Sequence, residues 1–177
     1  RKFCLESTVW DNISASGDVG ANLEHGFCCP LLLQVAADIR SAFPRLYSDL
    51  IFSSCWSFKY YEKESGDGLH GDSGLRNLNL WLTPDDANLD TNTGGLTFWD
   101  KKVPLLEIQN SPKKKSIEIM RGIISEPDTK ATKVPYKGNR AGLFESNIIH
   151  CTDTLNFKPG YENRRINITF VYGMPDY

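Results

Sequence analysis

The stretch GDGLHGDSGLRNLNLWL, residues 66–82, places a histidine and an aspartate, His70 and Asp72, two positions apart and just before a strand-like run. In residues 75–82, leucines alternate with asparagines and a tryptophan, and this period of two predicts a strand with two different faces. Taken alone, His70 and Asp72 fit two interpretations: two ligands of one metal ion, or a polar turn before the strand. The rest of the chain has to decide between them.

The composition is that of a folded domain without a strong charge bias. A length of 177 residues is enough for one domain with a buried core, and 40% hydrophobic residues are ordinary for such a domain. The net charge of -2 gives no general attraction to nucleic acids, and no apolar run approaches the roughly 20 residues that span a bilayer. We therefore expect a cytoplasmic protein without a nucleic-acid or membrane partner.

The start of the chain and its cysteines add two further expectations. The chain begins with Arg1 rather than Met, so we expect that it continues upstream, where a further domain has room. An odd number of cysteines without a CxxC pair favours reduced thiols over a disulfide framework. The five are Cys4, Cys28, Cys29, Cys55 and Cys151.

Residues 30–43, PLLLQVAADIRSAF, are the clearest helical segment. The proline at position 30 suits a first helical turn, and the proline at position 44 is expected to end the helix. Apolar residues recur there at helical spacing. They are Leu32, Val35, Ala36, Ile39 and Phe43.

After this helix the pattern becomes that of a β protein. Strands are predicted at residues 51–61, 75–82, 96–99, 140–144, 147–150 and 165–172. Residues 83–95 form a loop, and residues 101–133 form a lysine-rich insertion with helical character near residues 117–120. One helix followed by short strands predicts a single domain over residues 1–177. It has an N-terminal helical buttress at 1–50 and a sandwich or barrel at 51–177.

A second histidine supports the metal interpretation. On an extended backbone, residues two positions apart point to the same side, so His70 and Asp72 can reach one ion together. His150 ends another apolar strand eighty residues later and can complete a set of two imidazoles and one carboxylate. Such a set suits Fe(II) and leaves coordination positions open for other ligands.

The last strand carries a polar stripe. Strand alternation places Arg165, Asn167 and Thr169 on one face and three apolar residues on the other. A buried arginine there needs an anion, such as the far carboxylate of an oxo acid bound to the metal. The alternatives are an edge strand with a solvated face, or Arg164 as the anchor, which alternation disfavours because Arg164 shares the apolar face.

These features occur in an order that resembles the Fe(II)/2-oxoglutarate-dependent dioxygenase superfamily, with the prolyl-4-hydroxylase-like branch nearest. The resemblance runs from about residue 56 to residue 173. It rests on HGD at 70–72, GGLTFWD at 94–100, NRAGLFESNIIHCTD at 139–153 and GYENRRINITFVYG at 160–173. It implies a mainly β fold with flanking helices, a double-stranded β-helix of the jelly-roll, cupin-like kind.

The resemblance also implies roles for individual residues. His70, Asp72 and His150 become the metal ligands, and Arg165 becomes the anchor of the C5 carboxylate of 2-oxoglutarate. Asn167 stands where some relatives have a serine. Weaker candidates, for which simple wall packing is an equal alternative, are Tyr60 and Asn79 as contacts of the oxo acid and Trp81 on the substrate side.

The implied activity is hydroxylation of an unactivated C–H bond by dioxygen, coupled to decarboxylation of 2-oxoglutarate to succinate. The implied cofactor is Fe(II), with 2-oxoglutarate as cosubstrate and ascorbate as a reductant. The expected substrate is a protein side chain, with a small metabolite as the next choice. A second alternative is a cupin-like metal-binding domain without oxo-acid chemistry. A third is a jelly roll that only binds a partner.

Overall fold

The structure is a computed structural model, and it describes residues 1–14, 17–64, 68–108 and 111–174. Its helices are α1 (Lys2–Glu6), α2 (Pro30–Ala42), α3 (Pro44–Tyr47), α4 (Leu105–Ile108) and α5 (Lys113–Ile124), with short 3₁₀ turns η1 (Leu23–His25), η2 (Asp85–Ala87) and η3 (Tyr161–Asn163). None of the helices in these ranges is long and apolar enough to cross a membrane.

The strands form two main sheets. The larger has the order β1 (Asn12–Ile13), β2 (Val19–Asn22), β3 (Ile51–Lys59), β11 (Ile166–Gly173), β5 (Arg76–Trp81) and β8 (Ala141–Glu145). The smaller has the order β7 (Ala131–Val134), β6 (Leu96–Lys102) and β9 (Ile148–Thr152). A third pair joins β10 (Leu155–Asn156) to β4 (Lys63–Glu64). Neighbouring strands run antiparallel.

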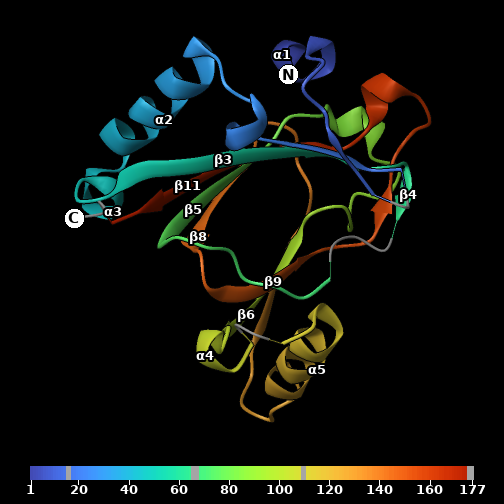
Figure 1. The fold of residues 1–177 in the computed structure, drawn as a ribbon. Helices are drawn as coiled ribbons and strands as arrows, with labels where there is room; N and C mark the ends of the chain where they lie inside the picture. The colour runs from blue at the N-terminus through green and yellow to red at the C-terminus, as the bar shows by residue number, and fades with distance from the viewer. Residues whose placement is uncertain (15–16, 65–67, 109–110, 175–177) are drawn as a thin grey trace.

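The two main sheets face each other, with the larger above the smaller in Figure 1. A cluster of apolar and aromatic side chains fills one part of the space between them, including Tyr60 and Trp81 from the larger sheet and Leu96 from the smaller. Gly95 enters β6 so close to β7 that a Cβ atom there would lie 1.8 Å from the carbonyl oxygen of Val134. Only glycine fits this close approach.

Helix α2 covers the outer face of the larger sheet, as Figure 1 shows. Leu32, Ala36 and Ile39 are buried at the predicted helical spacing, and the Tyr172 hydroxyl donates to the carbonyl oxygen of Ala36 at 2.9 Å. The helix was predicted to end at Pro44. Helix α2 does end just before it, at Ala42. Pro44 also begins the short helix α3 after a single non-helical residue, because proline suits the first turn of a new helix.

The six predicted strands are present, with ends that move by a few residues. Residues 1–50 were assigned no strand, yet β1 and β2 lie there and extend the larger sheet at its edge. The insertion at 101–133 contains α4 and α5. Helix α5 packs its apolar side on a small core of Val103, Met120 and Ile149 under β9.

Candidate metal centre and its cavity

Backbone pairing brings the two predicted metal-ligating histidines side by side. The amide of His70 donates to the carbonyl oxygen of His150 at 3.0 Å, and the amide of His150 donates back to His70 at 2.9 Å. The ring centroids are 4.3 Å apart. An isolated bridge between the loop before β5 and strand β9 therefore holds two residues together that are eighty positions apart in the sequence.

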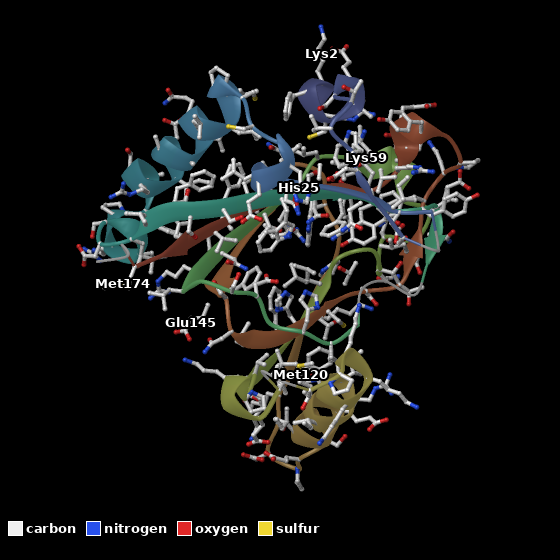
Figure 2. The ribbon with its side chains drawn as sticks, viewed as in Figure 1. Lys2, His25, Lys59, Met120, Glu145 and Met174 are labelled. Carbon is white, nitrogen blue, oxygen red and sulfur yellow. The ribbon has the colours of Figure 1, made fainter. Side chains whose placement is uncertain are left out.

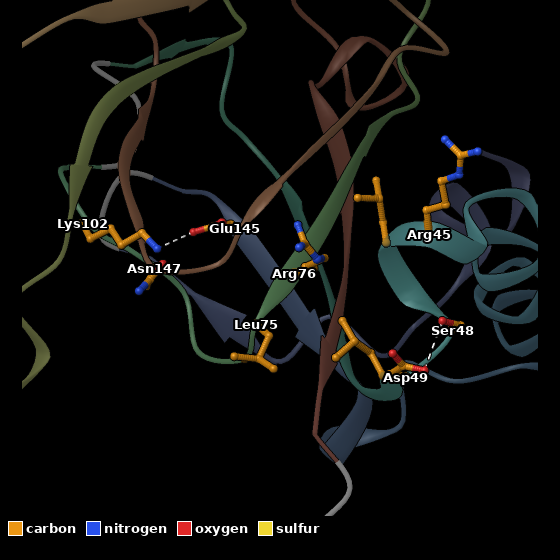
Figure 3. Close-up of a pocket in the computed structure, with 11 residues that line it drawn as sticks. Arg45, Ser48, Asp49, Leu75, Arg76, Lys102, Glu145 and Asn147 are labelled. Atoms are coloured by element: carbon orange, nitrogen blue, oxygen red, sulfur yellow. Dashed lines mark hydrogen bonds and ion pairs between the residues drawn. The ribbon is translucent and has the colours of Figure 1, made fainter.

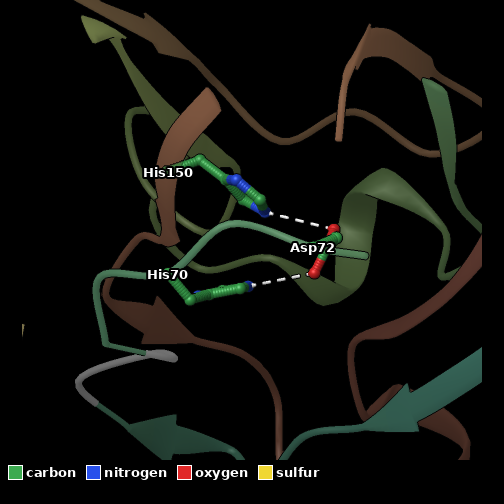
Figure 4. A group of neighbouring side chains, drawn as sticks. All are labelled: His70, Asp72 and His150. Carbon is green, nitrogen blue, oxygen red and sulfur yellow. Dashed lines mark ion pairs between the residues drawn. The ribbon is translucent and has the colours of Figure 1, made fainter. Parts of the chain in front are cut away.

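Asp72 faces both rings. One of its carboxylate oxygens lies 3.7 Å from Nε2 of His70, and the other lies 3.5 Å from Nε2 of His150 (Figure 4). One ligand atom from each residue can be chosen so that all three lie within 4.8 Å of one another. Ligands about 2.1 Å from a shared ion and at right angles to each other are about 3 Å apart, so small side-chain rotations would close this set around one ion.

The other ring nitrogens fix which histidine atoms face Asp72. Nδ1 of His70 lies 2.6 Å from the carbonyl oxygen of Gly68, and Nδ1 of His150 lies 2.9 Å from that of Ile148. A proton on each Nδ1 donates to these carbonyls, which leaves the lone pair of each Nε2 for a metal ion. Gly71, between the two ligands of the HGD motif, packs so tightly that a Cβ atom would lie 2.5 Å from a methyl group of Val103.

A buried amide holds the carboxylate of Asp72. Asn77 Nδ2 donates to Asp72 Oδ2 at 2.5 Å, and Ser146 Oγ donates to Asn77 Oδ1 at 2.8 Å. Asn77 and Ser146 are fully buried, and the amide of Asp72 also donates to the carbonyl oxygen of Ser146 at 2.7 Å. Sequence reasoning assigned no role to either residue. The sequence signal that could have found Asn77 is its place on the same strand face as Asn79 and Trp81.

Arg165 lies at the far end of the space between the sheets. Its side chain is only 1% exposed. Nε donates to the carbonyl oxygen of Gly94 at 2.7 Å, and Nη1 contacts Asn167 Oδ1 at 3.4 Å. The guanidinium lies 4.9 Å from the ring centre of Tyr60, and Nη2 has no hydrogen-bond partner among the described residues. A buried guanidinium donor without an acceptor is costly, and a carboxylate would satisfy it.

Arg164 points elsewhere. It is only partly buried, its Nη1 donates to the carbonyl oxygen of Gly17 at 3.2 Å, and its guanidinium lies 5.5 Å from the ring centre of Tyr61. The two neighbouring arginines thus diverge as strand alternation predicts. Only Arg165 is directed toward the space between the sheets.

An inner cavity joins the triad to the residues around Arg165. Its lining residues are Trp56, Phe58, Tyr60, His70, Asp72, Asn79, Leu96, His150, Thr152, Asn167 and Thr169. Asn79 Nδ2 donates to Thr169 Oγ1 at 2.8 Å, while Asn79 Oδ1 is buried with no partner among the described residues. The predicted oxo-acid contacts Tyr60, Asn79 and Asn167 therefore line one cavity together with the triad.

Trp81 is placed differently from the expectation that it faces the substrate. It stacks on Tyr136, with ring centres 5.3 Å apart, and lies 5.7 Å from the guanidinium of Arg165. It is absent from the described linings of the cavities that reach the triad. Burial raises the pKa of the Tyr136 phenol, which donates to the carbonyl oxygen of Thr83. Both rings therefore belong to the wall around Arg165.

Two larger cavities lie outside this space. One, of about 480 Å³, includes His70 and Asp72 in its lining and so opens onto the triad. The other lies around Arg45, Arg76 and the Lys102–Glu145 ion pair, whose charged atoms are 2.6 Å apart (Figure 3). None of the triad residues lines this second cavity.

Comparisons with known proteins support the fold through structure alone. No family model and no curated protein matches the sequence. EctD from S. alaskensis with bound Fe has a TM-score of 0.59 at 16% identity, covering 98% of this chain and 63% of that one. The non-heme alpha ketoglutarate dependent epimerase SnoN from nogalamycin biosynthesis has a TM-score of 0.62 at 13% identity, covering 98% and 70%. HygX from Streptomyces hygroscopicus with nickel and 2-oxoglutarate bound has a TM-score of 0.55 at 15% identity, covering 99% and 78%.

These likenesses confirm the predicted fold class: a mainly β jelly roll of the cupin-like kind, with flanking helices. The chain spans less than two thirds of the EctD chain. At identities of 16% or less, the likeness concerns the fold. It does not test the prolyl-4-hydroxylase-like branch, which stays a prediction.

Proposed function

We propose that this chain is an Fe(II)- and 2-oxoglutarate-dependent dioxygenase that hydroxylates an unactivated C–H bond. In the overall reaction, one oxygen atom of dioxygen enters the new C–OH group and the other enters succinate, while 2-oxoglutarate loses carbon dioxide. The observation that carries the proposal is a cavity lined by a His-Asp-His group and by Tyr60 and Asn167. Both of the latter contact Arg165, a buried arginine with one nitrogen that lacks an acceptor among the described residues. Several structural neighbours are described with iron or 2-oxoglutarate bound.

The metal end fits Fe(II). His70, Asp72 and His150 would supply two neutral imidazoles and one carboxylate, the set that leaves three coordination positions for other ligands. When bound, the iron supplies the oxidative chemistry. The protein contributes geometry: backbone carbonyls orient both imidazoles, and Asn77 fixes the carboxylate. Such outer contacts are typical of metal centres that keep their ligands in place.

The other end fits a dicarboxylate. The unpartnered Nη2 of Arg165 would donate to its far carboxylate, next to Asn167 and the Tyr60 hydroxyl. The inner cavity is about 40 Å³, enough for a few water molecules. Entry of a five-carbon oxo acid therefore requires the lining side chains to move apart.

The cupin-like alternative, a metal domain without oxo-acid chemistry, explains the triad but not Arg165. In that alternative Nη2 of the buried guanidinium keeps no acceptor among the described residues, and burial of a guanidinium without an anion costs several kcal/mol. For the substrate, the sequence favours a protein side chain, with a small metabolite second. A cavity of about 480 Å³ beside the triad has the size of a small-molecule site, and this supports the second choice.

The test is anaerobic addition of Fe(II) and 2-oxoglutarate, which should give a visible charge-transfer band that His70→Ala removes. His25→Ala is the matched control, because His25 is exposed and lies 2.7 Å from a carboxylate oxygen of Asp11, away from the triad. No band at saturating concentrations contradicts the proposal. Metal binding without any effect of 2-oxoglutarate favours the cupin-like alternative.

A further inference from the structure

The larger cavity beside the triad carries information about the substrate, provided that the proposed function holds. Its described lining combines parts of the N-terminal edge of the larger sheet, the loop of the HGD motif and the start of α5. The lining residues are Asn12, Gly20, Ala21, Asn22, Glu24, Ser54, Trp56, Phe58, Gly68, Leu69, His70, Asp72, Ser73 and Lys113. Because His70 and Asp72 are among them, a molecule in this cavity lies against the proposed iron.

Two opposite charges come to this cavity from distant parts of the chain. Apart from the triad, Glu24 in η1 and Lys113 at the start of α5 are the charged side chains in its described lining. No hydrogen bond or ion pair occupies either side chain within the described part of the chain. Asn22, two positions before Glu24, adds an amide oxygen that is buried and has no partner there. Glu24 and Asn22 thus offer hydrogen-bond acceptors, and Lys113 offers a cation.

The part of the cavity shared with the inner cavity is aromatic. Trp56 and Phe58 project from β3 on the same strand face and line both cavities. Leu69 adds an aliphatic side chain next to the first proposed ligand. This surface suits an apolar carbon skeleton and brings its C–H bonds close to His70 and Asp72.

We infer that the substrate is a small zwitterion of the amino-acid type. Its ammonium group would face Glu24 and the amide oxygen of Asn22, its carboxylate would face Lys113, and its carbon skeleton would lie on Trp56 and Phe58. A residue inside a protein chain has neither a free ammonium nor a free carboxylate group at its α-carbon. Such a substrate would leave Glu24 and Lys113 without groups of opposite charge.

The experiment uses the protein loaded anaerobically with Fe(II) and 2-oxoglutarate, so that binding is read from changes in the charge-transfer band without turnover. The probes are the free proteinogenic L-amino acids, each with its N-acetyl and amide derivatives. At least one free amino acid should change the band saturably, and either derivative should bind at least about tenfold more weakly. Lys113→Glu should weaken binding by a similar factor. Lys115→Glu, on the same helix but outside the cavity lining, should have no effect.

The outcomes separate this inference from the proposed function. A normal band that no free amino acid changes overturns the zwitterion and leaves the dioxygenase intact. Equal binding of the N-acetyl or amide derivatives, or indifference to Lys113→Glu, also overturns it. Failure of the band to form at all overturns both the dioxygenase and the inference that rests on it.

Discussion

Two fully buried cations lie on opposite faces of the larger sheet, and their surroundings differ. Lys59, in β3, is 0% exposed and lies under the N-terminal segment, 3.9 Å from the ring centre of Trp10 and hydrogen-bonded to the Tyr161 hydroxyl (Figure 2). Arg165 is 1% exposed on the inner face and keeps one nitrogen without an acceptor. Neither forms an ion pair with a carboxylate among the described residues.

The difference shows which buried charge indicates a ligand. Burial lowers the pKa of Lys59 to about 8, so its side chain can relieve part of the cost of burial by losing a proton. A guanidinium stays protonated in proteins and cannot relieve the cost of burial in this way. Lys59 is therefore accounted for by its own contacts and its lowered pKa, whereas Arg165 has no anionic partner among the described residues. This is why we place the oxo acid at Arg165.

The largest expected effect comes from removing the cation that lacks a partner. Arg165→Met should weaken 2-oxoglutarate binding by about 100-fold or more, because the bound carboxylate loses its buried partner. The free energy of unfolding without 2-oxoglutarate should not fall, since no existing ion pair is broken and the cost of burying an unpaired charge is removed. Titration of the charge-transfer band and urea unfolding measure the two quantities.

Arg164→Met is the control, because Arg164 contacts the carbonyl oxygen of Gly17 and the Tyr61 ring rather than the inner cavity. It should leave 2-oxoglutarate affinity nearly unchanged. If the two variants weaken binding equally, Arg165 is not the anchor. A loss of several kcal/mol of stability in Arg165→Met would show that the guanidinium already has its partner.

A smaller effect is expected at the metal end, where the partly buried carboxylate of Asp72 already has a hydrogen-bond donor. Asn77→Ala removes the amide that donates to Asp72 and should lower iron affinity about 10- to 100-fold. Asn79→Ala, two residues along the same strand, should leave iron affinity unchanged and weaken 2-oxoglutarate instead. Competition with a chelator measures the iron, and the band titration measures the oxo acid. Equal effects of both variants on iron would contradict the separation of the two ends.

The sequence predicted those parts of the site that depend on local periodicity. Residues two apart on an extended backbone point to the same side, so the proximity of His70 to Asp72 and the divergence of Arg165 from Arg164 could be expected from spacing. His150 was expected at the end of an apolar strand and lies in the middle of β9. Its position beside His70 depends on pairing between distant segments. In the structure His70 and Asp72 lie close together, and Arg164 and Arg165 contact different groups.

Contacts between distant segments could not be predicted from local periodicity. The bond between Asn77 and Ser146 depends on how β5 lies next to the turn after β8. The two-residue strand β1 is too short to show any period. Trp81 has the alternation of a cavity residue, but its large ring stacks on Tyr136 beside Arg165, and only the tertiary structure shows this.

The last expected effect concerns Lys59 and appears only as a pH dependence. Its folded-state pKa of about 8 lies below the value of about 10.4 in an unfolded chain, chiefly because of burial. Between these values the unfolded chain binds more protons, so this group makes the free energy of unfolding rise with pH. Its destabilising effect is complete below pH 8 and fades toward pH 10.4.

Lys59→Met removes this dependence while keeping a long apolar side chain. The stability of the variant relative to the parent should therefore be highest at pH 7 and should fall steadily when urea unfolding is repeated at pH 9 and 10. Lys114→Met, at an exposed position on α5, should show no such trend. A constant difference between Lys59→Met and the parent from pH 7 to 10 would mean that Lys59 keeps its charge when buried. Lys59 would then need an anion as Arg165 does, and the contrast between the two cations would no longer locate the oxo acid.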